Sequence, residues 1–125
     1  MNRLHIETEA GEFTAELREC ATSRKILDLL PIEGTVMLWG EEIYVSIPMH
    51  MELEPDARAD VSVGDLAYWP DGPALCLFFG STPMSTGPEP RAYSAVSVIG
   101  ALLDDPSRLK TIREGSAIRV VTADP

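Results

Sequence analysis

The sequence has little cysteine, little basic charge and no long apolar run, and each shortage excludes a class of protein. Two cysteines, Cys20 and Cys76, cannot form a disulfide framework, and the N-terminus lacks the segments of an export signal, so we expect a reducing cytoplasm. Ten basic residues against twenty acidic ones give a net charge of -10, which repels phosphate backbones and anionic lipids. No apolar run approaches the roughly 20 residues that span a bilayer. We therefore expect no nucleic-acid partner and no membrane partner.

What is present is the composition of one ordinary folded domain. Hydrophobic residues make up 45% of the 125 residues and charged residues 24%. A chain of this length buries roughly two thirds of its unfolded surface without disulfides or metals. We expect a single domain over residues 1–125.

The chain is organised around residues 64–80. Two apolar, aromatic-rich runs, 64–69 and 74–80, flank the turn sequence Pro70-Asp71-Gly72-Pro73, which predicts a hairpin. Both arms are too apolar to leave one face in water. Each arm should therefore be covered on both sides or line the inside of a closed sheet.

The rest of the chain reads mostly as short strands. Alternating or β-branched runs predict strands over 2–8, 11–17, 32–39, 42–47, 95–102 and 117–121, and residues 49–63 fit an extended edge followed by a turn. A short helix capped by Thr22 or Ser23 should end at Pro31, and a second should begin after Asp105. About eight strands and two short helices favour a barrel or a sandwich. Eight is a number whose closed interior side chains can fill.

Six short stretches of the sequence stand out, namely LPIEG at 30–34, WGEEIY at 39–44, VGDLAYWP at 63–70, FFG at 78–80, PRA at 90–92 and VIG at 98–100. Together they resemble a small prokaryotic family of mostly uncharacterised cyclophilin-like proteins. The resemblance implies a mainly β fold, a closed eight-stranded cyclophilin-like β-barrel with two short helices, shared with peptidyl-prolyl isomerases. Fold alone does not transfer function.

The isomerase residues do not carry over to this sequence. Isomerases have a Phe-His-Arg motif and a Gln-Gly-Gly run, and their arginine is aimed at the prolyl amide, where it weakens the resonance of the peptide bond. The central hairpin here contains neither arginine nor glutamine. Isomerase activity is therefore not expected from these positions.

The proline-rich loop over residues 81–91 is the predicted rim of a site. A connection of this length without periodicity is usually functional or disordered. Arg91 is held in a stiff segment beside Tyr93 and Ser94, and its guanidinium can bind a carboxylate or an amide carbonyl. An equally weighted interpretation is a structural arginine that bonds loop carbonyls or pairs with Glu89.

Aromatic and hydroxyl side chains supply the other binding candidates. Trp69 and Phe79 belong to the hairpin aromatics, together with Tyr68 and Phe78, and at most half of these can face one site. Barrel core explains most of them, and Trp69 is the preferred surface member because its indole N–H needs a partner. The loop adds Ser81, Thr82, Ser85 and Thr86, for which local turn hydrogen bonds are the better explanation than a nucleophile. The predicted ligand-binding residues are Arg91, Trp69, Tyr93, Phe79, Thr82 and Ser85.

No metal and no cofactor are predicted. His50, Glu52 and Glu54 share one side of an extended segment, but an acidic solvated edge explains them better than a metal site. Cys76, between two leucines, is more typical of a small buried hydrophobe than of a reactive thiol.

These residues lead to one main functional hypothesis and two alternatives. The main hypothesis is a groove-binding module for a peptide or small polar ligand. The first alternative is an enzyme, either similar to a peptidyl-prolyl isomerase or related to amide-directed hydrolases, and the sequence leaves catalysis undecided. The second alternative is a metal-binding module through His50.

Overall fold

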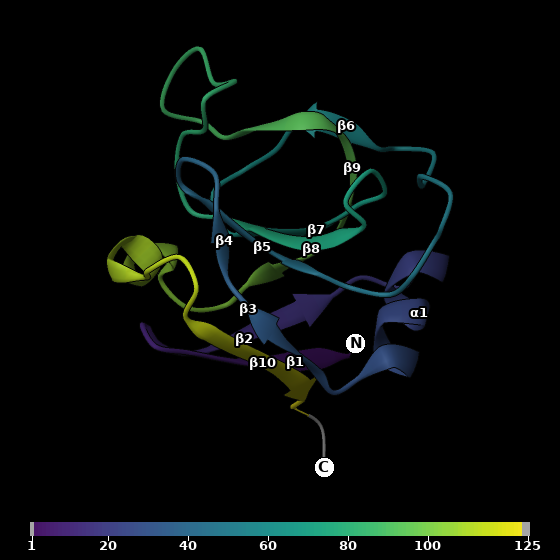
Figure 1. Cartoon of the computed structure of the whole chain (residues 1–125). Helices are drawn as coiled ribbons and strands as arrows, with labels where there is room; N and C mark the ends of the chain where they lie inside the picture. Colours follow the sequence, from purple (N-terminus) through teal and green to yellow (C-terminus); the bar gives the residue numbers. More distant parts are fainter. Residues whose placement is uncertain (1, 124–125) are drawn as a thin grey trace.

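The computed structural model describes residues 2–123, which form ten strands, one α-helix and one 3-10 helix (Figure 1). The strands are β1 (Arg3–Thr8), β2 (Gly11–Leu17), β3 (Ile32–Thr35), β4 (Met37–Leu38), β5 (Glu42–Ser46), β6 (Arg58–Asp60), β7 (Asp65–Trp69), β8 (Ala74–Phe78), β9 (Arg91–Leu102) and β10 (Ala117–Thr122). The helices are α1 (Ala21–Leu29) and η1 (Pro106–Thr111). The mainly β fold with two short helices is confirmed.

The strand count differs from the expected eight for two reasons. The run over 32–39 is interrupted at Val36, so that β3 pairs with β10 while β4 pairs with β5. Residues 49–63 contribute a short strand, β6, which pairs with β9. β9 also begins at Arg91, four residues before the predicted start at 95.

The sheet does not confirm a closed barrel. Its strands follow one another in the order β3-β10-β1-β2-β9-β7-β8-β5-β4, with β6 attached to β9. The two ends of this path, β3 and β4, are consecutive in the chain and are joined through Val36 rather than by a ladder of hydrogen bonds. The described strands thus form one strongly bent sheet with two ends.

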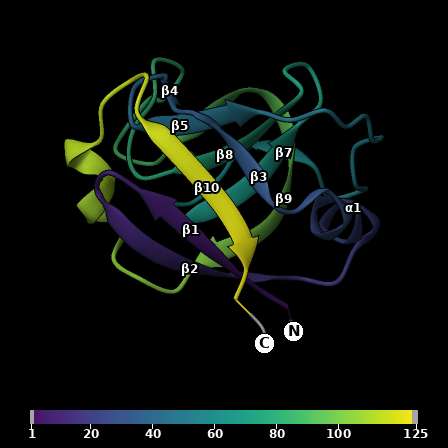
Figure 2. The same cartoon turned by 60° about the horizontal axis from the view of Figure 1, so that its bottom comes forward.

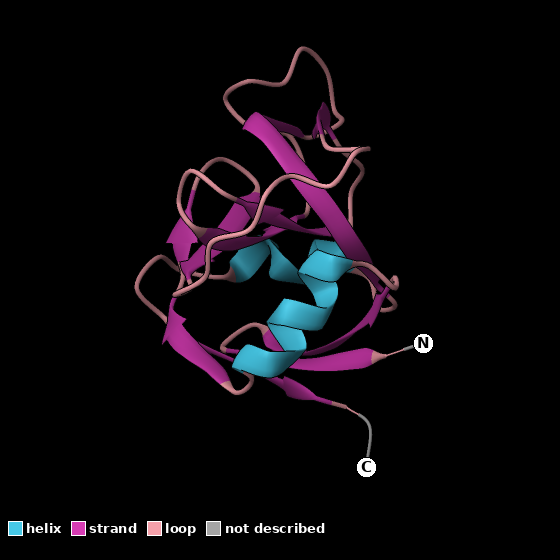
Figure 3. Ribbon diagram, turned by 90° about the vertical axis from the view of Figure 1, so that its right-hand side faces the viewer, coloured by secondary structure: helices cyan, strands magenta, loops and turns pink. Residues whose placement is uncertain are grey.

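The two helices lie at opposite ends of the sheet (Figure 2). The cap of α1 is Cys20, whose Sγ accepts from the Ser23 N–H, while Ser23 Oγ accepts from the Cys20 N–H at 3.1 Å. The predicted cap, Thr22 or Ser23, was therefore wrong, and the helix begins two or three residues earlier. The Cys20 thiol accepts the capping hydrogen bond that a serine or threonine hydroxyl usually accepts. Asp105 caps η1 as expected, and its carboxylate accepts from the Ser107 N–H at 3.0 Å. Figure 3 shows α1 in front of the strands.

The interior contains two hydrophobic clusters that share strands. The main cluster includes the five residues predicted to point inward from the first hairpin, namely Leu4, Ile6, Phe13, Ala15 and Leu17. The second cluster is smaller and consists of Val61, Ala67, Ala74, Cys76, Phe78, Ala92 and Val96. Leu75 and Leu77 of β8 face the main cluster, whereas Cys76 between them faces the second. This alternation confirms that the second arm of the hairpin is covered on both sides.

The cover over the second cluster comes from β6 and the first half of β9. Figure 1 shows these two strands above β7 and β8. β9 pairs with β6 through Val96 and Arg91, then continues to pair with β7 from Ser97 onward. The second cluster is therefore enclosed between β9 on one side and β5, β8 and β7 on the other.

No helix in residues 2–123 is long and apolar enough to cross a membrane.

Candidate functional site

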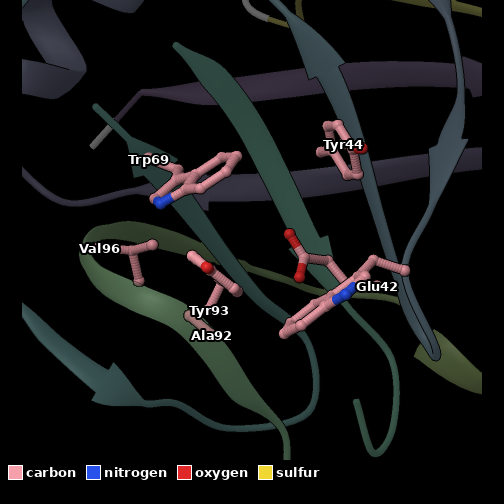
Figure 4. Close-up of a pocket in the computed structure, with 7 residues that line it drawn as sticks. Glu42, Tyr44, Trp69, Ala92, Tyr93 and Val96 are labelled. Carbon is pink, nitrogen blue, oxygen red and sulfur yellow. The ribbon is translucent and has the colours of Figure 1, made fainter. Parts of the chain in front are cut away.

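A cavity of about 210 Å³ opens at the edge of the second cluster. Its lining comes from the turn before β5 and from β5, β7 and β9, and consists of Trp39, Glu42, Tyr44, Trp69, Ala92, Tyr93 and Val96. Figure 4 shows the labelled side chains arranged around the carboxylate of Glu42. We call this cavity, with these seven residues, the aromatic pocket.

Strand alternation places the lining residues of β5 and β7 on one face. Ile43 and Val45 of β5 belong to the main cluster, so Glu42 and Tyr44 point to the opposite face. In β7, Tyr68 faces the main cluster, and Trp69 packs against the second. The pocket is therefore built on the outer face of the strands whose inner face forms the main core.

The four aromatic rings stand nearly perpendicular to their neighbours. The centroids of Trp39 and Tyr93 are 6.0 Å apart at an interplanar angle of 75°. Tyr93 and Trp69 are 6.2 Å apart at 73°, and Trp69 and Tyr44 are 6.4 Å apart at 76°. Edge-to-face contacts at these distances are favourable, so the rings support one another as the walls of a box.

Hydrogen bonds fix two of these walls. Trp69 Nε1 donates to Ser94 Oγ at 2.7 Å, and Ser94 Oγ donates to Asp71 at 3.1 Å. The backbone N–H of Trp39 donates to the backbone carbonyl of Glu42 at 2.9 Å, across a turn that contains Gly40. Gly40 has a φ of 60°, and a Cβ there would lie 2.9 Å from Thr82 Cα, so only glycine fits this turn against the 81–91 loop.

Glu42 is the one carboxyl group that lines the pocket. Glu42 is only 5% exposed, and burial raises the pKa of its carboxyl from 4.5 to about 7. The buried Cys76 thiol donates a hydrogen bond to this carboxyl, which lowers the pKa by a smaller amount. The same burial raises the pKa of Cys76, so this thiol is not reactive, as the sequence indicated. Near neutral pH, Glu42 therefore exchanges readily between acid and carboxylate.

The structure brings two of the six predicted ligand-binding residues into this pocket, Trp69 and Tyr93. Phe79 lies in the main cluster and is buried. Arg91 has a largely exposed side chain, and its Nη1 lies 3.8 Å from Asp60 Oδ1. Its partner is thus a carboxylate of β6 and not the neighbouring Glu89 that sequence reasoning considered. Binding roles for Phe79 and Arg91 stay predictions.

Thr82 and Ser85 tie the 81–91 loop to itself. The Thr82 N–H donates to Ser85 Oγ at 2.9 Å, and Ser85 Oγ donates to the Glu89 carbonyl at 2.7 Å. The Thr82 hydroxyl donates to the Arg91 carbonyl. These local bonds match the turn interpretation of the loop hydroxyls, and a role in ligand binding stays a prediction for both.

One of the three candidate metal ligands, Glu54, binds the start of α1; the other two candidates were His50 and Glu52. Glu54 Oε2 accepts from the Thr22 N–H at 3.0 Å and from Thr22 Oγ1 at 2.6 Å, at the start of α1. These bonds lower the pKa of Glu54, so its carboxylate is engaged in holding the helix terminus.

A different group of metal-ligand type occurs on the first hairpin. Among the described residues, His5, Glu7 and Glu12 have ligand atoms within 4.8 Å of one another. Arg119 Nη1 lies 3.5 Å from Glu7 Oε2 and supplies positive charge to this exposed group. Ion pairs on a solvated sheet surface account for it.

Sequence reasoning missed Trp39, Glu42 and Tyr44. The signal was available in the segment WGEEIY, where Glu42 and Tyr44 alternate with the apolar Ile43. Residues on the second face of a strand that is covered on both sides must be buried too. A glutamate at such a position indicates a functional site, because a buried carboxyl is costly.

The fold and the pocket define a class, a small mainly β protein with an aromatic site on the outer face of its curved sheet. The cyclophilin-like family model matches residues 2–121, so the chain belongs to the cyclophilin-like family. The chain is also similar to a hypothetical protein from Archaeoglobus fulgidus known from a solution structure. The two share 40% sequence identity and a TM-score of 0.82, over 98% of this chain and 95% of that one. No curated protein matches the chain.

Proposed function

We propose that this chain is a binding module that holds a small ligand, or one side chain of a peptide, in the aromatic pocket. The observation that carries the proposal is the convergence of four aromatic rings, from separate segments, around a buried carboxyl group. Binding sites combine an apolar lining with a few convergent polar groups in this way. Trp and Tyr are also the residues that contribute most to recognition.

The size of the pocket limits the ligand. At about 210 Å³ it is smaller than the pockets of roughly 300–1,000 Å³ that enclose drug-sized molecules. A small head group or a single side chain is therefore the proposed occupant, and the rest of a larger ligand would lie outside along β9 and the 81–91 loop.

An enzymatic function has one supporting observation. A glutamate with a pKa of about 7 has the pKa that suits a general acid or base at neutral pH. The other lining residues include no serine, cysteine, histidine or arginine that could act beside it. The geometry therefore supports binding better than hydrolysis or prolyl isomerisation.

Tryptophan fluorescence tests the binding proposal directly, because both tryptophans of the sequence, Trp39 and Trp69, line the pocket. The protein would be titrated with a panel of N-acetyl amino-acid amides that covers acidic, basic, apolar and aromatic side chains. We expect a saturable change in emission for at least one class.

Two variants of β9 provide the matched comparison. Ala92 is buried in the pocket wall, so Ala92→Leu narrows the pocket and should abolish the change. Ala101, on the same strand, is exposed, and Ala101→Leu should preserve it. If no member of the panel gives a saturable change, or if both variants respond alike, the proposal is wrong.

A further inference from the structure

The charge of the aromatic pocket is of one sign. Glu42 is its only ionisable carboxyl, and no lysine, arginine or histidine is among the seven lining residues. Within residues 2–123, no basic side chain forms an ion pair with Glu42. The neighbouring Glu41 lies 3.9 Å from Lys110 and forms its ion pair there. The buried carboxyl has a thiol partner but no positive one.

We infer that the occupant of this pocket is an organic cation, an alkylammonium group seated among the four rings with Glu42 as its counter-charge. The inference rests on the proposed function, since it assigns the chemistry of the ligand in the same pocket. The cation can belong to a free amine or quaternary ammonium compound, or to a side chain with the same head group. The pocket is large enough to contact only that head group.

The aromatic rings supply the first attraction. The face of an aromatic ring carries negative charge density and attracts a cation, most strongly for Trp and then Tyr. This pocket has two of each, Trp39, Trp69, Tyr44 and Tyr93, and their perpendicular arrangement surrounds one small volume. Several rings around a single cavity form the kind of cage that recognises alkylated ammonium groups.

Glu42 supplies the second attraction and separates a cation from a neutral ligand. A neutral apolar group would gain contact with the rings but would leave the carboxyl buried without a positive partner. A cation would instead stabilise the ionised form and lower the pKa of Glu42. Binding should then release a proton near neutral pH.

The groups that face Glu42 allow this proton linkage. Tyr44 on the same strand and Tyr93 from β9 line the pocket with Glu42, and the Cys76 thiol from β8 donates a hydrogen bond to its carboxyl. β7 contributes Trp69, which has no titratable group. The carboxyl of Glu42 is therefore the group whose ionisation sets the pH dependence of binding between pH 6 and pH 8.

A pair of probes with the same shape and different charge tests the inference. Choline carries a trimethylammonium group, and 3,3-dimethylbutan-1-ol has a carbon atom in place of the charged nitrogen. Both would be titrated at pH 8 and pH 6 with tryptophan fluorescence and calorimetry. We expect choline to bind at least tenfold more tightly than the alcohol at pH 8. Its affinity should fall about tenfold at pH 6, because a group with a pKa of about 7 is then mostly protonated.

Two neighbouring variants separate the carboxyl from the general charge of the protein. Glu42→Gln should reduce the preference for choline and remove its pH dependence, and the amide resembles the neutral acid closely enough to preserve the fold. Glu41→Gln removes a charge one residue away, outside the lining, and should preserve both properties. Circular dichroism of each variant checks the fold independently of binding.

Each outcome decides the inference. Equal affinity for choline and the alcohol overturns the cation assignment and leaves the binding module standing. Silence toward choline, with a saturable response to acidic or apolar members of the amide panel, also overturns it. If neither choline nor any member of the panel gives a saturable change in emission, both the inference and the proposed function are overturned.

Discussion

The indole Nε1 of Trp69 donates a hydrogen bond of 2.7 Å to the hydroxyl of Ser94, which links the end of β7 to β9 beside the aromatic pocket. Ser94 in turn donates to Asp71 in the hairpin turn, at 3.1 Å. One wall of the pocket is thus held from the side opposite the ligand space. The indole N–H, for which sequence reasoning predicted a partner in a ligand mouth, has that partner within the protein.

Replacing Ser94 should loosen the pocket and leave the fold intact. In Ser94→Ala the indole loses its acceptor, and one such hydrogen bond contributes about 0.5–1.5 kcal/mol. We expect the Kd to rise a few-fold for whichever ligand changes the tryptophan emission of the wild type. The tryptophan emission maximum should also shift. Urea unfolding should change by no more than about 1 kcal/mol. Ser107→Ala, on exposed η1, serves as the control and should alter neither ligand binding nor the emission maximum.

Tyr68 is the buried anchor of the segment after β5. Its side chain is completely buried, its hydroxyl donates to the Met49 carbonyl at 2.9 Å, and it accepts from the Met51 N–H at 3.2 Å. Tyr68→Phe leaves the buried Met49 carbonyl and the partly buried Met51 N–H without this partner. We expect a loss of about 1–3 kcal/mol in the free energy of unfolding, measured with urea. Tyr93→Phe, at a residue that is 66% exposed, should change stability little. Equal losses in both variants would contradict the anchoring role.

Glu42 makes stability depend on pH in a defined direction. Its pKa is raised from 4.5 to about 7 in the folded protein, so the folded state binds more protons than the unfolded state between these values. The free energy of unfolding therefore falls as the pH rises from 4.5 through 7, by an amount on the order of 3 kcal/mol. Glu42→Gln cannot ionise, and it should lack this decrease and be the more stable protein at pH 8.

Urea unfolding of both proteins at pH 5, 6.5 and 8 measures this effect as a difference. Contributions from the other ionisable groups are common to both proteins and cancel in the comparison. Glu41→Gln should follow the wild-type curve, since its side chain lies outside the pocket. A parallel dependence in wild type and Glu42→Gln would show that the carboxyl of residue 42 is not the group responsible.

We expect no acceleration of prolyl isomerisation at micromolar protein. Catalysis requires a guanidinium aimed at the prolyl nitrogen to lower a barrier of roughly 18–20 kcal/mol. No arginine lines the aromatic pocket, and Arg91 lies near Asp60 on β6. A coupled peptide assay measures this. Acceleration by the wild type that disappears in Arg91→Ala would revive the enzymatic alternative.

The sequence predicted the architecture well because local patterns determine it. Alternation identified the first hairpin, the apolar arms at 64–69 and 74–80 identified strands covered on both sides, and Asp105 with Pro106 identified η1. The break of the run 32–39 at Val36 was not predictable, because it depends on which strands pair with each half. Long-range pairing of this kind leaves no local signature.

The site was harder to predict because its residues are distant in the sequence. Trp69 and Tyr93 were chosen for their chemistry, and the fold does bring them together. Glu42 escaped notice because a glutamate beside another glutamate reads as a solvated charge. The register of β5 against β8, which places Tyr44 opposite Cys76, shows that this face of β5 meets the second cluster.

The sharing of β8 between two clusters has a consequence for substitutions in this strand. Leu75 and Leu77 serve the larger cluster that holds the molecule together, while Cys76 and Phe78 serve the smaller one beneath the pocket. Substitutions at neighbouring positions of this one strand therefore act on different parts of the molecule. A change at position 76 or 78 reaches the support of the pocket, whereas a change at position 75 or 77 reaches the main core.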